Sequence, residues 1–457
     1  MGAAYELMSK GIRPLVLEKT RHIGGIARTE VYHGYRFDIG GHRFFTKVNR
    51  VFQLWQEILG DNLITVPRRS HIYYQGKYFH YPMEILDALI KLGVGESLLV
   101  MASYLKAKAF PIPDVHSFDQ WVTNHFGRRL YEIFFKDYTE KVWGIPCSQI
   151  AAEWAAQRIR GLSLPVAIKN AITGKNRPKT LIKEFTYPVH GPGMMWEAFC
   201  QQVVAGGGEF KPESHVVEVR HRGTRFHSVL VRQGENLVEI QGDSFISSMP
   251  LGELILSMNP PAPAHVAEAA RQLQHRAFLM VGLILNQPEL FPDNWIYINS
   301  GEVQVGRIQN FGNWSRAMVP DPATTSLGLE YFCNEDDETW RKPDRELVQQ
   351  AWSELQKLGL AGKSKLIDGT VFRQSKAYPV YKGDYRNQIH TAQEYLATFE
   401  NLQSIGRNGM HRYNNMDHSL LSGLLAAENV MGARHDCWEV NRQQDYHESL
   451  ESSEKGK

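Results

Sequence analysis

Residues 12–41 read IRPLVLEKTRHIGGIARTEVYHGYRFDIGG, and this stretch decides the fold class. The run from Pro14 to Glu18 predicts a buried strand that closes on an acidic residue, and residues 3–11 before it predict an amphipathic helix ended by Gly11. A helix followed by such a strand is the second half of a βαβ unit that binds a dinucleotide. In that unit the acidic residue at the strand end binds ribose hydroxyls, which makes Glu18 a candidate ligand.

A glycine pair and an arginine follow this strand. Gly24 and Gly25 would let the backbone approach a pyrophosphate closely, and Arg28 would neutralise its charge with a planar pair of donors. A plain glycine-rich turn with a surface arginine is the alternative reading. The order of strand, Glu18, glycine pair, Arg28 and then GYRFDIGG favours a flavin dinucleotide.

Composition limits the classes of function. The chain has 457 residues, with 51 Lys and Arg against 49 Asp and Glu, so it predicts neither a nucleic-acid-binding surface nor a polybasic membrane patch. Four scattered cysteines lack metal or redox spacing, and we expect no metal site. We see no signal peptide, and the most apolar stretch is too short and too rich in lysine to span a bilayer. The expected location is the cytoplasm.

The pattern along the chain predicts an α/β protein of several interleaved parts. A hairpin is expected at 71–82, a helical insertion from about 83 to 182, antiparallel strands at 278–285, 294–299, 305–311 and 326–333, and a helix beginning near Met416. We therefore predict a discontinuous dinucleotide-binding domain (1–62, 186–262 and 395–437), a helical domain (83–185), an antiparallel-sheet substrate domain (63–82 and 263–394) and a disordered tail (438–457).

Three further motifs carry a resemblance to a known family. They are GGHRFFT (40–46), FFKDYTEKVWGIP (134–146) and GRNGMHRYNNMDHSLLSGLLAAEN (406–429). Together with the opening stretch they resemble the flavoproteins that include amine oxidases, protoporphyrinogen oxidase and UDP-galactopyranose mutase, and the likeness to the mutases extends through most of the chain. The resemblance implies a Rossmann-like FAD-binding domain, a helical insertion and an antiparallel-sheet substrate domain.

Residues are carried over only where the motifs match. On the mutase pattern, Arg158 and Arg307 bind the substrate diphosphate, with Arg160 as an alternative to Arg158, and His42 lies against the flavin ring. The residues expected around the substrate are Tyr81, Trp143, Tyr297, Tyr378 and Tyr413. The residues expected around FAD are Glu18, Gly24, Gly25, Arg28, Gly40, Gly41, His42, Val217, Gly406, Arg407, Met416, Asp417 and His418.

The resemblance also implies an activity. It points to an isomerase that interconverts the pyranose and furanose forms of a nucleotide sugar similar to UDP-galactose, through an adduct between the sugar and N5 of reduced FAD, in cell-envelope polysaccharide synthesis. NAD(P)H is a candidate reductant, and the oligomeric state is open. The alternatives are an FAD-dependent oxidoreductase of the amine oxidase or protoporphyrinogen oxidase type, and a flavin-free scaffold.

The start of the chain departs from the family pattern. In the family a strand and a Gly-x-Gly-x-x-Gly turn precede the helix, whereas here only Met1 and Gly2 come before residues 3–11. We therefore expect the chain to be truncated just after the glycine-rich loop, through a wrongly chosen start codon or a shortened gene.

Overall fold

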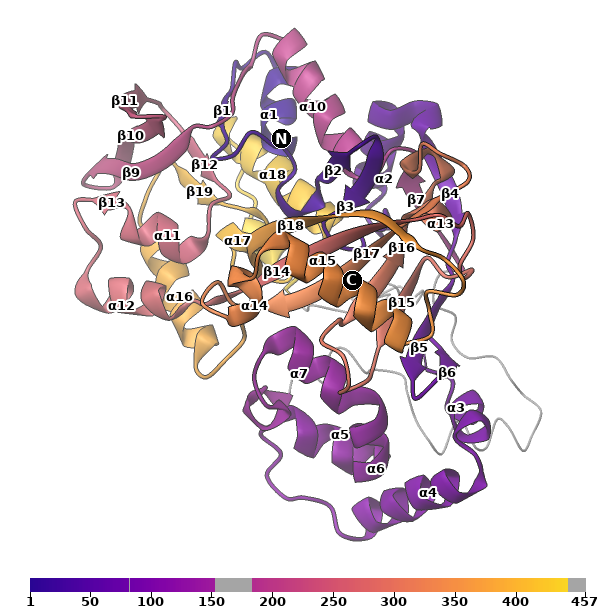
Figure 1. The fold of residues 1–457 in the computed structure, drawn as a ribbon. Helices are drawn as coiled ribbons and strands as arrows, with labels where there is room; N and C mark the ends of the chain where they lie inside the picture. Colours follow the sequence, from indigo (N-terminus) through magenta and orange to yellow (C-terminus); the bar gives the residue numbers. More distant parts are fainter. Residues whose placement is uncertain (82, 153–182, 443–457) are drawn as a thin grey trace.

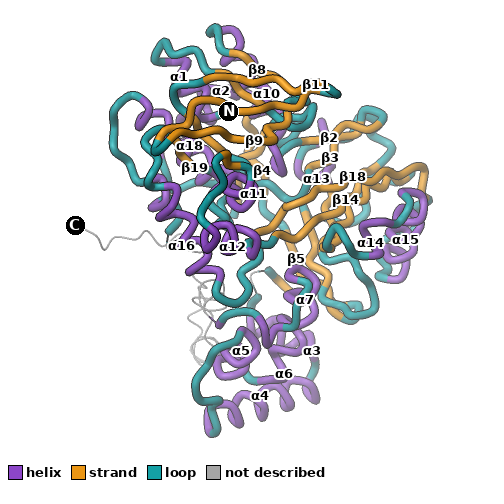
Figure 2. The backbone as a smooth tube through the Cα atoms, turned by 90° about the vertical axis from the view of Figure 1, so that its left-hand side faces the viewer, coloured by secondary structure: helices purple, strands orange, loops and turns teal. Residues whose placement is uncertain are grey.

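A computed structural model describes residues 1–81, 83–152 and 183–442. A twisted sheet with helices against it forms the middle of the molecule, a second group of strands and helices lies above and beside it, and a helical lobe lies below (Figure 1). The same three regions separate when the molecule is turned by a quarter (Figure 2). The chain visits the upper region at its beginning, middle and end.

The central sheet has seven strands in the order β18-β14-β17-β16-β15-β5-β6. Their bounds are Leu366–Pro379, His275–Leu285, Thr325–Cys333, Arg307–Asn310, Trp295–Ile298, Ser70–Tyr74 and Lys77–His80. The four predicted antiparallel strands are β14, β15, β16 and β17, and they pair antiparallel where they meet. The predicted hairpin is β5 and β6, which turns at Gln75 and Gly76 and joins the sheet through a parallel pair with β15.

Both faces of this sheet are covered. Along β14, Leu279 and Val281 pack toward helix α15 (Asp344–Lys357), whereas Phe278 and Met280 pack toward Phe37 on the opposite side. A strand buried on both faces has a continuous apolar run rather than an alternating one, as in FLMVGLIL. The sheet is therefore the centre of the core.

The upper region is built around packed helices and short parallel strands. Strand β1 (Leu15–Leu17) pairs parallel with β8 (Glu209–Lys211), and β12 (Phe245–Ser247) with β19 (Leu402–Ser404). Helix α1 (Gly2–Ser9) packs on α18 (Met416–Val430), where a Cβ on Gly2 would lie 2.3 Å from Leu420. The predicted helices are confirmed, but β1 is not fully buried, because Leu15 is 38% exposed.

A four-stranded sheet in the order β11-β10-β9-β13 lies at the edge of this region. Its strands are β9 (His215–Arg222), β10 (Arg225–Gln233), β11 (Asn236–Gln241) and β13 (Met258–Asn259). The apolar residues of HVVEVRH (215–221) predict the first of these strands, and the other three were not predicted. β10 and β11 were missed because outward-facing polar residues interrupt their short apolar runs.

The lower lobe consists of helices, as predicted. Its helices are α3 (Ile85–Leu92), α4 (Val94–Ala109), α5 (Phe118–Phe126), α6 (Arg128–Tyr131) and α7 (Asp137–Trp143), with a π-helical turn at Glu132–Lys136 before α7. Ser117 and Gln120 form the capping box that begins α5. Strand β4 (Leu63–Pro67), which sequence analysis assigned to the sheet domain, instead pairs with β7 (Glu184–Pro188).

The first residues of the predicted disordered tail are ordered. Residues 438–442 are packed against the body of the protein, because Arg412 Nη1 donates to the carbonyls of Trp438 and Val440 at 2.5 and 2.8 Å. Asn441 Nδ2 donates to Asn414 Oδ1 at 3.0 Å. The rest of the predicted tail, 443–457, lies outside the described residues.

Candidate functional site

The loop after β3 (Tyr35–Asp38) forms one wall of the site. Gly40 has φ of +99°, and a Cβ there would lie 3.8 Å from Nη2 of Arg307. A Cβ on Gly41 would lie 2.8 Å from Nε2 of Gln309, closer than real side chains approach. The two glycines therefore allow the loop to lie directly against strand β16.

His42 follows these glycines and is neutral. Burial, together with the charges of Arg407 and Arg307, lowers the pKa of His42 to about 4. Nε2 of the ring lies 3.0 Å from the carbonyl oxygen of Ile39, which accepts a hydrogen bond from the tautomer that carries its proton on Nε2. The loop thus presents an uncharged ring beside two guanidinium groups.

Arg307 is held by a buried acid that sequence analysis did not single out. Nε and Nη2 of Arg307 lie 2.7 and 2.6 Å from Oε2 of Glu330, which is fully buried and opposite Arg307 in the β16–β17 register. Gln309 Nε2 donates to Oε1 of the same carboxylate at 2.8 Å. The carboxylate orients the guanidinium plane and balances its charge, so Arg307 is a fixed group rather than a mobile surface arginine.

Tyrosines surround Arg307. Its guanidinium carbon lies 6.0 Å from the ring centre of Tyr297, whose own ring centre is 4.6 Å from that of Tyr81 and 5.3 Å from that of Tyr138. Burial raises the pKa of Tyr138 well above the usual value, so its hydroxyl stays protonated. Tyr138 is a site residue that sequence analysis quoted within a motif but did not select.

Two more arginines lie on the far side of these rings. The guanidinium carbon of Arg68 lies 5.3 Å from the ring centre of Tyr81 and 5.5 Å from that of Trp295, and that of Arg43 lies 4.8 Å from the Trp295 ring. Sequence analysis missed both arginines. The position of Arg43 directly after His42 in the GGHRFFT motif was the available signal.

Arg407, which the resemblance placed among the cofactor residues, lies beside Tyr378 and Tyr413. Its guanidinium carbon is 5.0 Å from the Tyr378 ring centre and 4.0 Å from that of Tyr413. Nε donates to the carbonyl of Ala377 at 2.9 Å and Nη1 to that of Asn414 at 3.1 Å, whereas the buried Nη2 has no hydrogen-bond partner in the described part of the chain. A buried donor without a partner is costly, so this atom points to a ligand.

The lower lobe reaches the same group of rings. Trp143 is buried at the end of α7, with its ring centre 6.0 Å from that of Tyr381, and the Tyr381 hydroxyl accepts from the backbone N–H of Tyr413 at 2.7 Å. The site is therefore bounded by the sheet, the lower lobe and the segment before α18.

Helix α18 begins beside this segment. Asn415 caps it in a box with His418, and Met416 and Asp417 form its buried first turn. Gly406, with φ of +77°, donates its N–H to Ser422 on the same helix at 3.1 Å. The predicted cofactor residues of the C-terminal motif thus lie around the beginning of one helix.

The predicted dinucleotide residues lie in the upper region. Glu18 follows β1 and accepts from the backbone N–H and the hydroxyl of Thr20 at 2.8 and 2.9 Å. Its carbonyl accepts from Ser214 at 2.8 Å, one residue before the strand that carries Val217. The structure therefore brings the segments of Glu18 and Val217 together.

Gly24, Gly25 and Arg28 lie in one turn. A Cβ on Gly24, at φ of +97°, would lie 2.5 Å from Trp196, while Gly25 faces open space. Arg28 Nε donates to Glu30 Oε1 at 2.5 Å and Nη1 to the Gly25 carbonyl at 3.0 Å. Arg28 is thus partly neutralised by Glu30, a pairing that sequence analysis did not predict. Arg158 and its alternative Arg160 lie outside the described residues.

These residues fit a flavin dinucleotide. Gly40 and Gly41 bring the loop directly against Arg307 and Gln309, and His42 is neutral. Among the described residues, the buried Nη2 of Arg407 has no hydrogen-bond partner. At the other end of the arrangement, Glu18 stands at a strand end with two acceptor oxygens. Among the described residues no group of three or more His, Cys, Asp or Glu is arranged to hold a metal ion.

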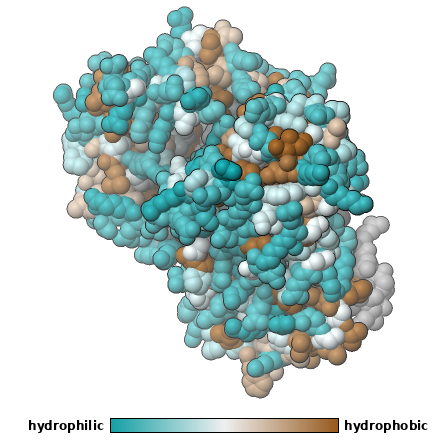
Figure 3. Space-filling view, viewed as in Figure 1, coloured by the Kyte–Doolittle hydropathy of each residue, from teal (hydrophilic) through white to brown (hydrophobic). Residues whose placement is uncertain are grey.

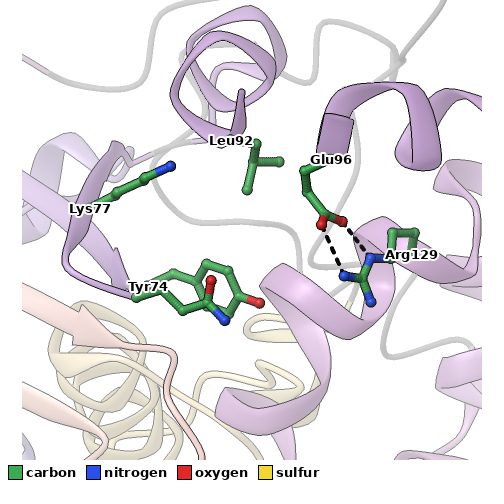
Figure 4. Close-up of a pocket in the computed structure, with 6 residues that line it drawn as sticks. Tyr74, Lys77, Leu92, Glu96 and Arg129 are labelled. Atoms are coloured by element: carbon green, nitrogen blue, oxygen red, sulfur yellow. Dashed lines mark hydrogen bonds and ion pairs between the residues drawn. The ribbon is translucent and has the colours of Figure 1, made fainter. Parts of the chain in front are cut away.

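A separate pocket of about 160 Å³ lies between the β5–β6 hairpin and the lower lobe (Figure 4). Its lining residues are Tyr74, Gln75, Lys77, Leu92, Glu96 and Arg129, and Glu96 and Arg129 form an ion pair at its wall. No residue predicted for the site lines this pocket, so it does not belong to the arrangement described above.

Comparisons with solved structures support the fold. The chain superposes on a reduced UDP-galactopyranose mutase with a TM-score of 0.83 and 20% identity, covering 98% of this chain and 97% of the other. A putative protoporphyrinogen oxidase from Exiguobacterium sp. 255-15 gives 0.69 at 15% identity, with 94% and 95% covered. A putrescine oxidase bound to putrescine gives 0.60 at 14% identity, with 94% and 96% covered.

The family is shown by a separate comparison of the sequence. The family model described as flavin containing amine oxidoreductase matches residues 1–431, which is nearly the whole chain. It spans the glycine loop, Arg307 and the beginning of α18 alike. The chain therefore belongs to the flavin containing amine oxidoreductase family.

Proposed function

We propose that the protein is an FAD-dependent isomerase that interconverts the pyranose and furanose forms of a sugar linked to a nucleoside diphosphate, with a substrate similar to UDP-galactose. The observation that carries this proposal is the guanidinium of Arg307, fixed by buried Glu330 against the Gly40–His42 loop and ringed by tyrosines. A fixed planar fork beside protonated phenols is suited to a diphosphate carrying a sugar.

Each part of the chain has a task in this proposal. Arg307 binds the diphosphate and stabilises the charge that grows on it as the bond to the sugar breaks, with Arg68 and Arg43 strengthening the positive potential nearby. The rings of Tyr297 and Tyr378 pack against the sugar, and their hydroxyls donate hydrogen bonds to the substrate. The surrounding side chains keep water from competing for these hydrogen bonds. Glu330 holds Arg307 in its orientation and does not contact the substrate.

The residues on the other side hold the cofactor. Arg407 and the beginning of α18 would bind the pyrimidine end of FAD, and neutral His42 would lie against its ring without adding charge. Glu18 would bind the ribose, and Gly24 and Gly25 the pyrophosphate. Bound FAD in its reduced form supplies a nucleophilic ring nitrogen, so the protein needs no strong acid or base of its own.

An FAD-dependent oxidoreductase is the second candidate, and the description of the matched family favours it. Such an enzyme consumes its substrate in net redox turnover, whereas the isomerase needs reductant only once, to prime the flavin. NAD(P)H is the proposed reductant in the cell. The described cysteines are all unpaired, which supports a location in the reducing cytoplasm.

The first experiment is an assay of the purified protein under anaerobic conditions. The flavin is reduced with dithionite or NADPH, UDP-galactofuranose is added, and the sugar products are followed by chromatography. We expect UDP-galactopyranose to form only with reduced flavin. If no sugar is converted and the protein consumes oxygen with an amine or a porphyrinogen, the protein is an oxidoreductase and the isomerase proposal is wrong.

Arg307→Lys tests the role of the fork. Lysine keeps a positive charge for Glu330 but loses the planar donors, so we expect the dissociation constant for UDP to rise by at least about tenfold. FAD content, measured by absorbance, stays unchanged. Arg316→Lys is the matched control, because Arg316 forms an exposed ion pair with Glu289. An equal loss of FAD and UDP binding in Arg307→Lys would show that Arg307 serves the cofactor instead.

A further inference from the structure

Helix α4 at the far end of the lower lobe is apolar on both of its sides. Its inner side contributes Val100, Tyr104 and Ala107 to the lobe's packing, and these are buried. Its outer side carries Val94, Leu98 and Leu105, which are 80%, 66% and 60% exposed. A helix that is apolar all round is normally covered on every side, so the outer side of α4 is unusual for a surface helix.

The exposed residues form one continuous stripe. Val94, Leu98, Ala102, Leu105 and Ala109 follow one another at spacings of three and four residues, and all are exposed. Their span of 94–109 corresponds to about 22 Å of helix. We call these five residues the α4 stripe.

Three neighbours widen the apolar surface. Leu99 lies beyond Lys106, about 100° from the midline of the α4 stripe. Ile90 comes from the end of α3, and Phe110 follows the last residue of α4. The side chains of Leu99, Ile90 and Phe110 are 56%, 79% and 78% exposed. Apolar side chains gather at this lower end of the space-filling view (Figure 3). Single exposed apolar residues are ordinary, but a contiguous group marks an interaction surface.

Lysines lie along both edges of the α4 stripe. On a helix with 3.6 residues per turn, Lys106 and Lys108 lie about 80° to either side of its midline. Both are exposed. The ammonium of Lys108 donates to the backbone carbonyl of Asn124 at 3.0 Å and lies 5.4 Å from the ring centre of Tyr104, so it must leave this carbonyl to reach a lipid phosphate. Long lysine side chains beside an apolar stripe reach the headgroup level while their stems lie on the apolar surface.

The acids within α3 and α4 are already ion-paired, and the exposed Asp114 lies in the loop after α4 rather than on the helix. The one acid of α4, Glu96, is ion-paired with Arg129 on the inner side, with Oε2 3.0 Å from Nη2. Asp87 of α3 is ion-paired with Lys91 at 2.7 Å. Glu84 is exposed, but it lies at the beginning of α3, a full helix away from the α4 stripe.

We propose that the α4 stripe docks on an anionic lipid surface, with its apolar side chains in the headgroup boundary and Lys106 and Lys108 on lipid phosphates. Helices that lie in a membrane interface have this combination of apolar face and flanking cations. No helix in the described ranges is long and apolar enough to cross a bilayer, so the contact is peripheral.

A second copy of the chain is a poorer match for this surface. In a two-fold interface the same patch comes from both subunits. The acids within α3 and α4, Asp87 and Glu96, are already ion-paired, so Lys106 and Lys108 would meet the lysines of the second copy without a free acid on these two helices. An anionic leaflet instead offers negatively charged phosphates at the headgroup level, next to the acyl region that would receive the apolar side chains.

Vesicle flotation of the whole protein tests the proposal. We expect binding to vesicles of phosphatidylcholine with about one third phosphatidylglycerol, and at least about tenfold weaker binding to phosphatidylcholine alone or at high salt. The double variant Leu98→Gln, Leu105→Gln should lose binding by at least about tenfold. Leu237→Gln with Ile367→Gln is the matched control, because both residues are 55% exposed on strands outside the lobe.

Further measurements keep the outcome unambiguous. Lys106→Glu changes one exposed residue, and it should weaken binding to anionic vesicles without altering the circular dichroism spectrum. Wild-type protein that fails to float with anionic vesicles, or a stripe variant that floats as well as the control, would overturn the proposal. Dimers that disappear in the stripe variant, with no vesicle binding, would assign the surface to a second copy. Neither result depends on the isomerase activity.

Discussion

Asp38 is a buried carboxyl group in a motif whose glycines and His42 drew the attention. It precedes the glycine loop, is 1% exposed, and accepts hydrogen bonds from the hydroxyls of Tyr187 and Thr29. Burial raises the pKa of Asp38 to about 7, although these hydrogen bonds act in the other direction. The glycine loop is thus attached to a carboxyl group that titrates near neutral pH.

This shift predicts how stability changes with pH. The unfolded chain releases the Asp38 proton near pH 3.8 and the folded protein near pH 7, so between these values the folded state binds more protons. The free energy of unfolding therefore falls as pH rises through this window, by a few kcal/mol at about 1.4 kcal/mol per pKa unit. Asp38→Asn should remove this decline, as measured by urea unfolding at a series of pH values.

The control for Asp38 is an acid without burial. Asp61→Asn changes an exposed residue and should leave the pH profile of the wild type unaltered. Parallel profiles for Asp38→Asn and the wild type would contradict the assignment of the titration to Asp38.

Residue patterns predicted part of the site. Arg307 could be selected because it is a charge in an apolar strand, and the same signal was present in Glu330 of SLGLEYFC. What the sequence does not contain is the register of β16 on β17, which places Arg307 opposite Glu330. Without that register, the sequence does not show that Arg307 and Glu330 form an ion pair. Arg307 is then interpreted as an arginine without a protein partner.

Elements were predicted well where their periodicity is strong. The central strands and α18 have long apolar runs, and the structure contains them. Strand β18 was missed, although it has 14 residues, because Asp368, Arg373 and Lys376 interrupt its pattern. Its place beside β14 is fixed by pairing with that strand rather than by its own composition.

Two glycines in the lower lobe give an element-scale prediction. A Cβ on Gly127, at φ of +84°, would lie 2.7 Å from the backbone nitrogen of Tyr104 in α4, and backbone cannot move aside. Gly127→Ala should therefore lower the free energy that holds α4 against α5 and α6 by more than about 2 kcal/mol. Faster hydrogen exchange of the α4 amides is the measurement.

Gly95 is the matched control within α4 itself. A Cβ there meets nothing within 4 Å, and alanine is the better helix former by about 1 kcal/mol. Gly95→Ala should slow exchange of the same amides. Equal effects of the two substitutions would mean that the close approach of Gly127 to α4 does not hold the helix in place.

At the scale of the whole molecule, the site depends on how the lower lobe is attached to the sheet. Asn299 directly follows β15, is 1% exposed, and reaches into the π-helical turn before α7. Its Nδ2 donates to the carbonyl of Ile133, and its Oδ1 accepts from the N–H of Tyr138 at 3.1 Å. The side-chain amide of Asn299 thus joins the carbonyl of Ile133 and the N–H of Tyr138, which are five residues apart in the helical segment. A π-helical turn is wider than an α-helical one and normally costs free energy, and this amide holds it in place.

This attachment was beyond sequence analysis for a physical reason. Asn299 looks like an ordinary strand-end residue, and FFKDYTEKVWG looks like an uninterrupted helix. Only the meeting of the two explains the π-helical turn. The same meeting places Tyr138 of the lobe beside Tyr297 of the sheet, and Trp143 lies beside Tyr381, which follows β18. The candidate site therefore takes residues from both the predicted helical domain and the predicted sheet domain.

Asn299→Ala should therefore weaken UDP binding without changing FAD content. It leaves a buried carbonyl and a buried N–H without partners, which costs about 2–4 kcal/mol of stability, and it loosens α7. We expect faster hydrogen exchange in 118–143 and weaker UDP binding, with FAD content unchanged, because the cofactor residues lie on the sheet and the upper region. Asn313→Ala is the matched control, since Asn313 donates to Phe291 and Asp293 at 2.8 Å within the sheet region alone. If Asn313→Ala weakened UDP binding as much as Asn299→Ala, general destabilisation would explain both, and the junction would have no special part in building the site.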